Sequence, residues 1–542
     1  MDKWSYEKKQ KVVHCIYSLG TRNENETSEF SVSSFYDANL TGYLINNRNH
    51  QVIQGSRGTG KTHILRVLEQ KMEDAHTHCV FLDCRNIGSS GSCGFDDDPN
   101  PARFFQHFLE ELQEKLSRYY EMYYFDNEEI KKDVFDLLVE LKAAVIISND
   151  EINKVTRTVS RNIDNKSNNK VGTQVGWPPS FGYKRQKNTQ IGKAQSEEIT
   201  QDISLRKSIS FSRFGRILGD LLFLTDKKLI ILLDEWSSIP LDIQPLFAEF
   251  LRRTLFPINE VKFKIAVVPH RKLFRTEQNG NSIGLELGAD IFVALDLDQR
   301  YSVDSSPKEI FAFCFGFFCQ HLSSHLDEII EPVEYLKNMF LDPSDAYVLV
   351  RAAEGNPRDF IHLTFLCLQS WQSEFSDDPT IDREAIIKSS KSYFETSKYS
   401  NCDEDSKDLL WKLIQFVVYT NENRGFLINK KYIKLHPWKT LIDQRILHVL
   451  DNNYFDYSST LSPCAILIIN FGAYSDILLN KKTVNFFCAG DFLEPKVFAK
   501  VPDEFPKKKL SYSGDRRFYC CFIDERNNLL FTRYFSNVRK KK

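Results

Sequence analysis

The sequence predicts an α/β protein built around a doubly wound parallel sheet. Three observations carry this prediction: a glycine-rich loop at residues 55–62 joins a strand to a helix, apolar strands alternate with amphipathic helices up to about residue 300, and an aliphatic run at residues 229–235 ends in two acidic residues. Strands that alternate with helices are typical of parallel sheets, because each parallel connection needs a crossover.

The predicted sheet domain follows a short N-terminal helix and a polar linker at residues 21–28. Apolar strands, all expected to be buried, are predicted at residues 52–53, 79–83, 229–233, 263–268 and 291–295. Helices are predicted at residues 63–72, 104–112 and 245–255.

Helical patterns then fill residues 308–322, 332–340, 344–353 and 358–371, which predicts a helical lid. Three short helical patterns between residues 406 and 449 precede strand-like segments at residues 465–469, 484–488, 518–523 and 529–534. This order favours a winged-helix-like module followed by a small β-rich region. The domain ranges expected from these patterns are 1–30, 31–300, 301–400 and 401–542.

Composition bounds the class of protein. A chain of 542 residues allows three or four domains at about 150 residues each. Its 71 basic and 73 acidic residues give a net charge of −2, with 42% hydrophobic and 27% charged residues. These values exclude wholesale disorder, collagen-like repeats and coiled-coil rods, and any attraction to nucleic acid must come from local patches.

The cysteines and apolar segments favour a cytoplasmic protein without a membrane partner. The 12 cysteines show no paired CxxC modules and no zinc-ribbon spacing, so we expect reduced thiols. The N-terminus lacks the apolar segment of a signal peptide. The longest apolar runs are shorter than the roughly 20 residues that cross a bilayer.

A polar insertion at about residues 150–200 interrupts the sheet domain. Between residues 154 and 193, nine basic residues face a single acid, and three aromatic residues that can stack on bases lie among them: Trp177, Phe181 and Tyr183. This segment predicts nucleic-acid affinity, with a solvated charge run as the alternative. Further basic clusters at residues 507–509 and 539–542 serve either the same end or solubility.

The strongest chemical signal is a complete G-x-x-x-x-G-K-[ST] phosphate-binding loop. Glycines let backbone N–H groups turn toward phosphates, and the following helix adds its positive N-terminus. The Lys61 ammonium can reach the β- and γ-phosphates, while the Thr62 hydroxyl can bind Mg²⁺. The motif predicts binding of ATP and Mg²⁺ by residues Gly55, Ser56, Arg57, Gly58, Thr59, Gly60, Lys61 and Thr62.

The aliphatic run at residues 229–235 matches a Walker B strand. Asp234 can hold the Mg²⁺ ion, and Glu235 can polarise the attacking water. The alternative is a strand that simply ends in charged residues. The order of the two motifs, with the acidic pair after the loop, favours the catalytic interpretation.

Four segments in this order resemble the ORC-type (origin-recognition-like) AAA+ ATPases and their bacterial relatives. They are residues 35–40, the loop at 55–62, Asp234-Glu235-Trp236, and Gly355-Asn356-Pro357-Arg358 at the start of a lid helix. The loop is generic to P-loop NTPases, whereas the Gly-Asn-Pro-Arg element is more discriminating. The resemblance covers roughly residues 31–370, with weaker similarity to a winged-helix extension beyond. It implies an AAA+ P-loop domain with a helical lid.

The resemblance also implies that Arg358 is a lid sensor, since a guanidinium can fork onto phosphate oxygens. The alternative is an ion pair between Arg358 and either Asp359 or Glu354. His270 stands where the family usually has a small polar sensor residue, so it either contacts the attacking water or γ-phosphate or is merely structural. Residues 284–290 lack the trans-acting arginine of the family, which leaves four candidates: Arg252, Arg253, Arg271 and Arg275.

The function expected from these features is an ATP-binding, slowly hydrolysing switch ATPase that acts on DNA or is recruited to it. The alternative is a STAND-like signalling ATPase of a defence system that uses ATP to assemble with a protein effector. An oligomer is compatible with both. A small-molecule kinase is disfavoured, because the lid, insertion and C-terminal modules exceed what such folds need.

Overall fold

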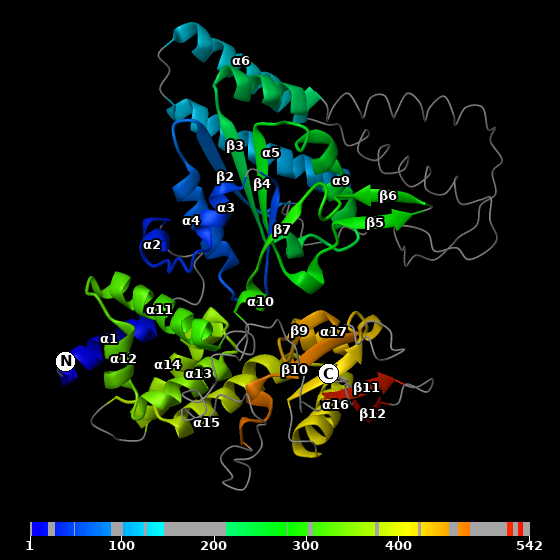
Figure 1. The fold of residues 1–542 in the computed structure, drawn as a ribbon. Helices are drawn as coiled ribbons and strands as arrows, with labels where there is room; N and C mark the ends of the chain where they lie inside the picture. Colours follow the sequence, from blue (N-terminus) through cyan, green and yellow to red (C-terminus); the bar gives the residue numbers. More distant parts are fainter. Residues whose placement is uncertain are drawn as a thin grey trace, which may run out of the picture. The chain divides into compact units, whose positions relative to one another are not determined.

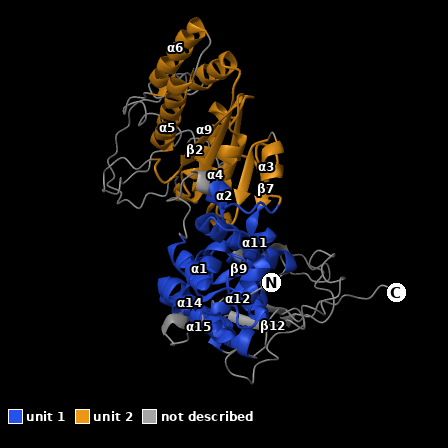
Figure 2. Cartoon of the chain, turned by 90° about the vertical axis from the view of Figure 1, so that its left-hand side faces the viewer, with its two compact units in different colours: residues 1–38, 56–63, 296–542 blue, residues 39–55, 64–295 orange. Residues whose placement is uncertain are grey.

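The chain contains two compact units in the computed structural model (Figure 2). Unit 1 comprises residues 1–38, 56–63 and 296–542, and unit 2 comprises residues 39–55 and 64–295. The described residues are 3–19, 28–47, 49–87, 101–123, 127–145, 213–278, 280–301, 307–373, 379–420, 424–454, 464–476, 518–523 and 529–534. The predicted polar insertion, the predicted strand at 484–488 and the basic clusters at 507–509 and 539–542 lie outside them. The four predicted domain ranges stay a prediction.

Unit 2 is built on a five-stranded sheet of order β2-β3-β4-β1-β7 (Figure 1). Pairing is parallel between β2 and β3, β3 and β4, and β4 and β1. The strands are β1 (Gln51–Gln54), β2 (Thr77–Asp83), β3 (Lys228–Asp234), β4 (Val261–Val267) and β7 (Phe292–Asp296). The predicted α/β fold class is confirmed.

Helices cover both faces of this sheet, as a doubly wound fold requires. Alternate strand residues such as Leu82, Ile231 and Ile265 pack with α5 (Pro101–Met122), α6 (Glu128–Val145) and α9 (Gln244–Thr254). On the other face, Arg66 of α4 (Lys61–Met72) lies over the Phe81 ring. Lys264 donates there to the Leu44 carbonyl of α3 (Thr41–Asn46).

The fifth strand corrects one expectation. We expected all five strands to be buried, but Phe292 and Val293 of β7 are 40% and 42% exposed. The reason is the strand order, which places β7 at the sheet edge beside β1. The hairpin of β5 (Arg275–Gln278) and β6 (Asn281–Gly284) was not predicted, since strands this short and polar show no apolar alternation.

Unit 1 contains the predicted helical lid. Its helices are α10 (Leu297–Arg300), α11 (Pro307–Leu326), α12 (Pro332–Met339), α13 (Ala346–Ala352), α14 (Pro357–Ser373) and α15 (Arg383–Tyr393), which continues as a π-helical turn to Lys398. The N-terminal helix α1 (Tyr6–Ser18) packs against α11 and α14, and α2 (Ser28–Ser33) contacts α11. Aromatic rings fill the interior, with Phe360 against Phe315 and Phe318.

The C-terminal part of unit 1 mixes helices with a second five-stranded sheet of order β12-β11-β8-β10-β9. Its elements are α16 (Glu404–Leu413), β8 (Gly425–Asn429), α17 (Trp438–Asp443), β9 (Leu447–Tyr454), β10 (Cys464–Ile469), β11 (Phe518–Ile523) and β12 (Leu529–Tyr534). The expected order of helices first and strands afterwards is wrong, because β8 precedes α17 and pairs with both β10 and β11. The winged-helix-like designation stays a prediction. Among the described residues, no helix has both the length and the hydrophobicity needed to span a membrane.

His50 makes the stability of unit 2 depend on acid. Its ring stacks on Phe256 at 3.9 Å between centroids, and its Nδ1 accepts from Phe263 N. Burial, followed by the charges of Lys262 and Lys264, lowers the pKa of His50 to about 4. In the unfolded state, His50 therefore binds a proton below about pH 6.5. In the folded state, it binds that proton only below about pH 4.

We expect unit 2 to lose stability as pH falls through this window, by up to about 3 kcal/mol from His50. The change His50→Asn keeps an acceptor near Nδ1 but removes the titration, so it should flatten the pH dependence of the free energy of unfolding, measured by urea denaturation. The same change at exposed His76 serves as the matched control. Equal slopes for both variants would contradict the assignment.

Candidate nucleotide-binding site

The glycine-rich loop has the predicted strand–loop–helix setting. Gly58 and Gly60 adopt φ of 88° and 90°, a left-handed region that side chains other than glycine rarely enter. Thr59 Oγ1 and Lys61 Nζ both donate to the Ser56 carbonyl, at 2.9 and 2.8 Å. Helix α4 begins at Lys61. The loop is therefore already shaped by its own hydrogen bonds.

An aspartate that the sequence analysis did not single out holds the start of the loop. Ser56 N donates to both carboxylate oxygens of Asp298 at 2.9 Å, and Ser56 Oγ donates to Asp298 Oδ2 at 3.0 Å. Asp298 lies in α10, whose N-cap is Asp296. Burial raises the pKa of the Asp298 carboxyl, although the Ser56 N–H bond opposes this. The alternating aspartates after the last strand are the sequence signal that marks this position.

The Gly-Asn-Pro-Arg element of the lid contacts the same loop. Asn356 Nδ2 donates to the Arg57 carbonyl at 2.8 Å, and Arg358 N donates to the Gly58 carbonyl at 3.3 Å. A Cβ atom on Gly58 would lie 2.6 Å from Asn356 Oδ1 and 2.8 Å from Arg358 Cβ. The structure thus brings together two motifs that are almost 300 residues apart in sequence.

Arg358 is half-buried near the start of α14. The alternative to its sensor role was an ion pair with Asp359 or Glu354. Both carboxylates hold other cations: Asp359 contacts Lys398 and Arg445, and Glu354 contacts Arg424. The role of Arg358 as a lid sensor stays a prediction.

The acidic pair lies at the carboxyl end of β3 in unit 2. Asp234 is 2% exposed, and its Oδ1 accepts from Glu235 N at 2.8 Å. Glu235 has a φ of 51°, so the chain turns sharply directly after the strand. Carboxylate and hydroxyl oxygens are ligands that Mg²⁺ prefers, which suits Asp234 and Thr62. Their roles in metal binding and catalysis stay predictions.

A buried glutamine at the start of α9 ties together the segments that follow β3 and β4. Gln244 Oε1 accepts from Trp236 Nε1 at 3.0 Å and from Leu273 N at 2.6 Å. Its Nε2 donates to the Ile239 and Arg271 carbonyls. All four hydrogen-bonding positions of the amide are used. Gln244 therefore positions the turns that carry Glu235 and His270, and no sequence signal singled it out.

His270 lies half-buried on the 3-10 turn Pro269–Arg271 that follows β4. The segment is held from the neighbouring strand end, since Val268 N donates to Ser237 Oγ at 3.1 Å. The position after β4 agrees with the expected sensor position in sequence order. Its contact with water or phosphate stays a prediction.

Three of the four candidate trans-acting arginines make ion pairs within unit 2. Arg252 and Arg253 both bind Glu249, at 2.8 and 2.5 Å, and Arg275 binds Glu286 at 2.9 Å. Glu249 also accepts from Gly284 N at 2.9 Å, and this hydrogen bond joins the hairpin to α9. Arg253 nevertheless keeps 72% of its side chain exposed.

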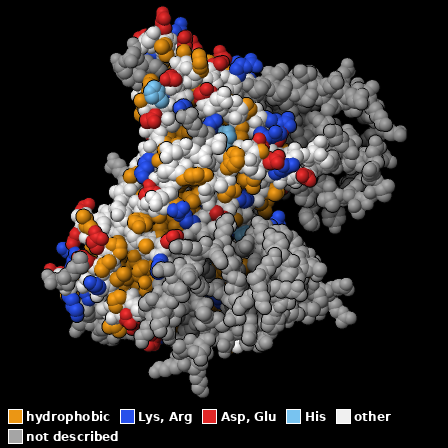
Figure 3. All heavy atoms as spheres, in the orientation of Figure 1, with side chains coloured by type: hydrophobic (Ala, Val, Ile, Leu, Met, Phe, Trp, Pro, Cys, Tyr) orange, Lys and Arg blue, Asp and Glu red, His pale blue; other side chains and the backbone are white. Residues whose placement is uncertain are grey.

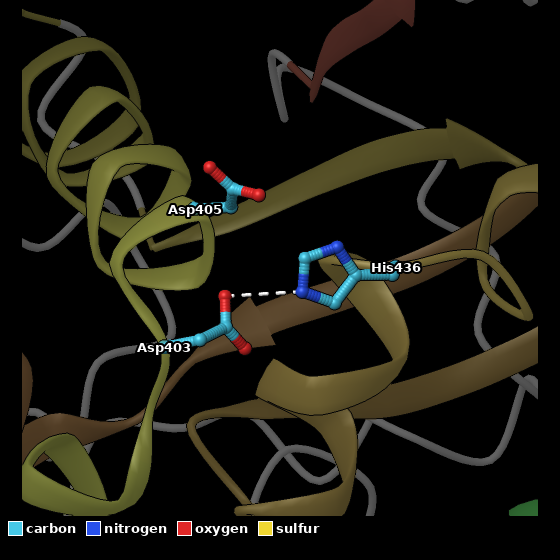
Figure 4. Close-up of side chains that lie close together, drawn as sticks. All are labelled: Asp403, Asp405 and His436. Carbon is cyan, nitrogen blue, oxygen red and sulfur yellow. Dashed lines mark hydrogen bonds and ion pairs between the residues drawn. The ribbon is translucent and has the colours of Figure 1, made fainter.

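A further group with metal-binding side chains lies in unit 1 and consists of Asp403, Asp405 and His436 (Figure 4). All three are exposed. Asp403 caps α16 by accepting from Ser406 N, and this bond lowers the pKa of its carboxyl to about 2. His436 Nε2 lies 3.0 Å from Asp403 Oδ1. Helix capping and one ion pair account for this arrangement, so we assign it no metal.

The segment that contains the glycine-rich loop matches a known protein family. Residues 20–75 match the ORC-CDC6-like family model. The predicted ORC-type resemblance is confirmed. The ORC-CDC6-like match includes β1, the glycine-rich loop and α4. No curated protein matches the chain.

Several solved structures align with most of this chain at low sequence identity. They include Cdc6p from Pyrobaculum aerophilum, 12% identical with a TM-score of 0.30, which covers 86% of this chain and 98% of its own. Orc1 from Aeropyrum pernix in complex with DNA is 11% identical with a TM-score of 0.31, and the alignment covers 88% of this chain and 98% of Orc1. Drosophila ORC bound to DNA is 8% identical with a TM-score of 0.30, and the alignment covers 89% of this chain and 94% of the ORC chain. The strand order β2-β3-β4-β1-β7 defines the fold of unit 2.

Gln244→Leu should destabilise unit 2 by about 3 kcal/mol, because it leaves the buried Trp236 N–H and the buried Ile239 carbonyl without partners and removes two part-buried bonds to Leu273 N and the Arg271 carbonyl. Thermal unfolding measures the change. Gln299→Leu is the matched control, since Gln299 is exposed. Equal unfolding midpoints for the two variants would show that the glutamine bridge contributes nothing.

Proposed function

We propose that this protein is an ATP-binding, slowly hydrolysing AAA+ switch ATPase that acts on DNA or is recruited to it. The observation that carries the proposal is the contact between the glycine-rich loop and the Gly-Asn-Pro-Arg element, through the Arg57 and Gly58 carbonyls. A phosphate-binding loop uses its N–H groups for the ligand. The lid therefore holds the opposite side of the peptide groups that would bind ATP.

The proposed roles follow from the chemistry of each side chain. Lys61 neutralises the β- and γ-phosphates, Thr62 and Asp234 hold Mg²⁺, and Glu235 orients the attacking water. Arg358 reads the terminal phosphate from the lid, and His270 assists from the turn after β4. Mg²⁺, when bound, would offset the charge that builds up on the phosphate oxygens.

The nucleic-acid part of the proposal rests on local charge. Residues 154–193 carry nine basic residues against one acid, in a chain of net charge −2. Basic residues with interleaved aromatics suit a phosphate backbone with exposed bases. This segment lies outside the described residues, so only its amino-acid sequence supports this part of the proposal.

A signalling ATPase that assembles with a protein effector is the second candidate. Exposed apolar side chains on and beside α12 favour it: Ile329, Val333 and Leu341 are 77%, 54% and 72% exposed. Figure 3 shows hydrophobic side chains gathered on this part of unit 1. Apolar surface of this kind is typical of contacts with other proteins.

Lys61→Ala should reduce ATP affinity by at least about tenfold, because a charge-assisted contact is worth roughly 1.5–3 kcal/mol. Titration calorimetry with a non-hydrolysable ATP analogue measures it. Lys71→Ala, at the exposed end of the same helix, is the matched control and should bind normally. Normal binding by both variants would reject the nucleotide site.

ATP turnover should be slow and should rise when duplex DNA is added. Glu235→Gln should abolish turnover in both conditions and keep ATP binding, since the amide is nearly isosteric but cannot activate water. If four basic residues meet phosphates, DNA affinity should fall about a hundredfold between 50 and 200 mM salt.

Deletion of residues 154–193 is the control for the nucleic-acid part. It should remove most of the salt dependence and leave basal turnover in place. Turnover that ignores DNA, together with undetectable DNA binding at low salt, would favour the signalling ATPase instead.

A further inference from the structure

A buried carboxylate directly after the predicted lid sensor gathers three partners. Asp359 is 2% exposed and contacts Arg445 Nη1 at 2.9 Å, Lys398 Nζ at 3.2 Å and the Tyr393 hydroxyl at 3.0 Å. Burial by itself raises the pKa of this carboxyl, but the charges of Arg445 and Lys398 hold it well below its usual range. Asp359 is therefore a charged centre inside unit 1 whose stability depends on both cations.

Arg445 reaches this centre from the C-terminal module, here defined as residues 404–476. It follows α17 with a φ of 56°, and its N–H donates to the Ile442 carbonyl. The next residue, Ile446, donates to Leu441. Together these bonds close the end of the helix in a left-handed turn, so the local structure of the module sets the direction of the Arg445 side chain.

The same guanidinium also touches the glycine-rich loop. Arg445 Nη1 lies 3.2 Å from the Arg57 carbonyl, which also accepts from Asn356 Nδ2 at 2.8 Å. One loop carbonyl thus receives a donor from the lid and a donor from the C-terminal module. The two hydrogens on Arg445 Nη1 can serve the Arg57 carbonyl and Asp359 Oδ1 at once.

A second buried pair joins the lid to the C-terminal module through the Glu354 carboxylate instead of a loop carbonyl. Arg424 binds Glu354 at 3.0 Å, with 7% and 4% of the side chains exposed. Glu354 Oε1 also accepts from Phe471 N at 3.3 Å. This pair offers a natural control, since it is also buried and also links lid and module.

We propose that Arg445 is a positioning residue that couples the nucleotide state of the glycine-rich loop to the C-terminal module. The inference rests on the proposed nucleotide function and adds a route of regulation to it. A phosphate bound at the Gly58 N–H would polarise the 57–58 peptide group and so change the strength of the Arg57 carbonyl as the acceptor that Arg445 shares with Asn356. Because Arg445 is anchored at Asp359, that change reaches α17 and β9.

The test compares Arg445→Lys with Arg424→Lys in the full-length protein. Both variants keep a cation beside a buried carboxylate, but only the first loses the shared contact with the loop. We expect Arg445→Lys to weaken binding of a non-hydrolysable ATP analogue about tenfold, and Arg424→Lys to stay within about twofold of the wild type. Calorimetry supplies these affinities.

Hydrogen exchange distinguishes coupling from a purely structural role, because a purely structural contact would not make amide exchange in the C-terminal module depend on nucleotide. In the wild type, saturating nucleotide should slow amide exchange in residues 438–454. The same saturating nucleotide should have no such effect in Arg445→Lys, while Arg424→Lys keeps it. If circular dichroism shows that Arg445→Lys is unfolded, Arg445→Gln replaces it under the same criteria.

Wild-type affinity and an intact exchange response in the Arg445 variant would overturn the inference alone. A wild-type protein that does not bind the analogue would instead overturn the proposed function, and the inference with it. Equal losses of ATP-analogue affinity and of the exchange response in the Arg445 and Arg424 variants would show that both pairs are only structural contacts. That result would reject the coupling.

Discussion

The packing of the lid in unit 1 depends on the carbonyl groups of the glycine-rich loop, which need hydrogen-bond donors. A loop that directs its N–H groups toward a ligand leaves its carbonyls on the other side, where they need donors. The Lys61 and Thr59 side chains donate to the Ser56 carbonyl, and donors from the lid reach the Arg57 and Gly58 carbonyls. The absence of a side chain on Gly58 lets the lid approach this closely. The lid contact is thus a consequence of the loop's own hydrogen bonding.

Several buried charges in the structure each have more than one partner. Asp359 has two cations and a hydroxyl, Glu354 has an arginine and a backbone N–H, and Glu249 has two arginines and a backbone N–H. Lys264 of β4 is fully buried, and its Nζ donates to the Leu44 and Asn47 carbonyls. Removing one partner from such a group leaves the others buried and unbalanced, which is strongly destabilising.

The predicted chemistry of unit 2 depends on a neutral group. The carboxyl ends of β3 and β4 carry Glu235 and His270, and neither turn is part of the regular sheet. Gln244 holds both turns through one amide with no net charge. A charged residue in that place would alter the field around Asp234, whereas an amide satisfies donors and acceptors without doing so.

By itself, the sequence determined the features that are local. Hydrophobic periodicity located the five strands and the lid helices, and glycine spacing located the loop, because both patterns lie within a few turns of chain. The edge position of β7 and the place of β8 among the helices needed the strand pairing. Asp298, Arg445 and Gln244 lie 242, 388 and 29 residues from Ser56, Arg57 and Leu273, which they contact. Only the tertiary structure decided their positions, since a hydrogen bond between distant residues leaves no periodic pattern in either segment.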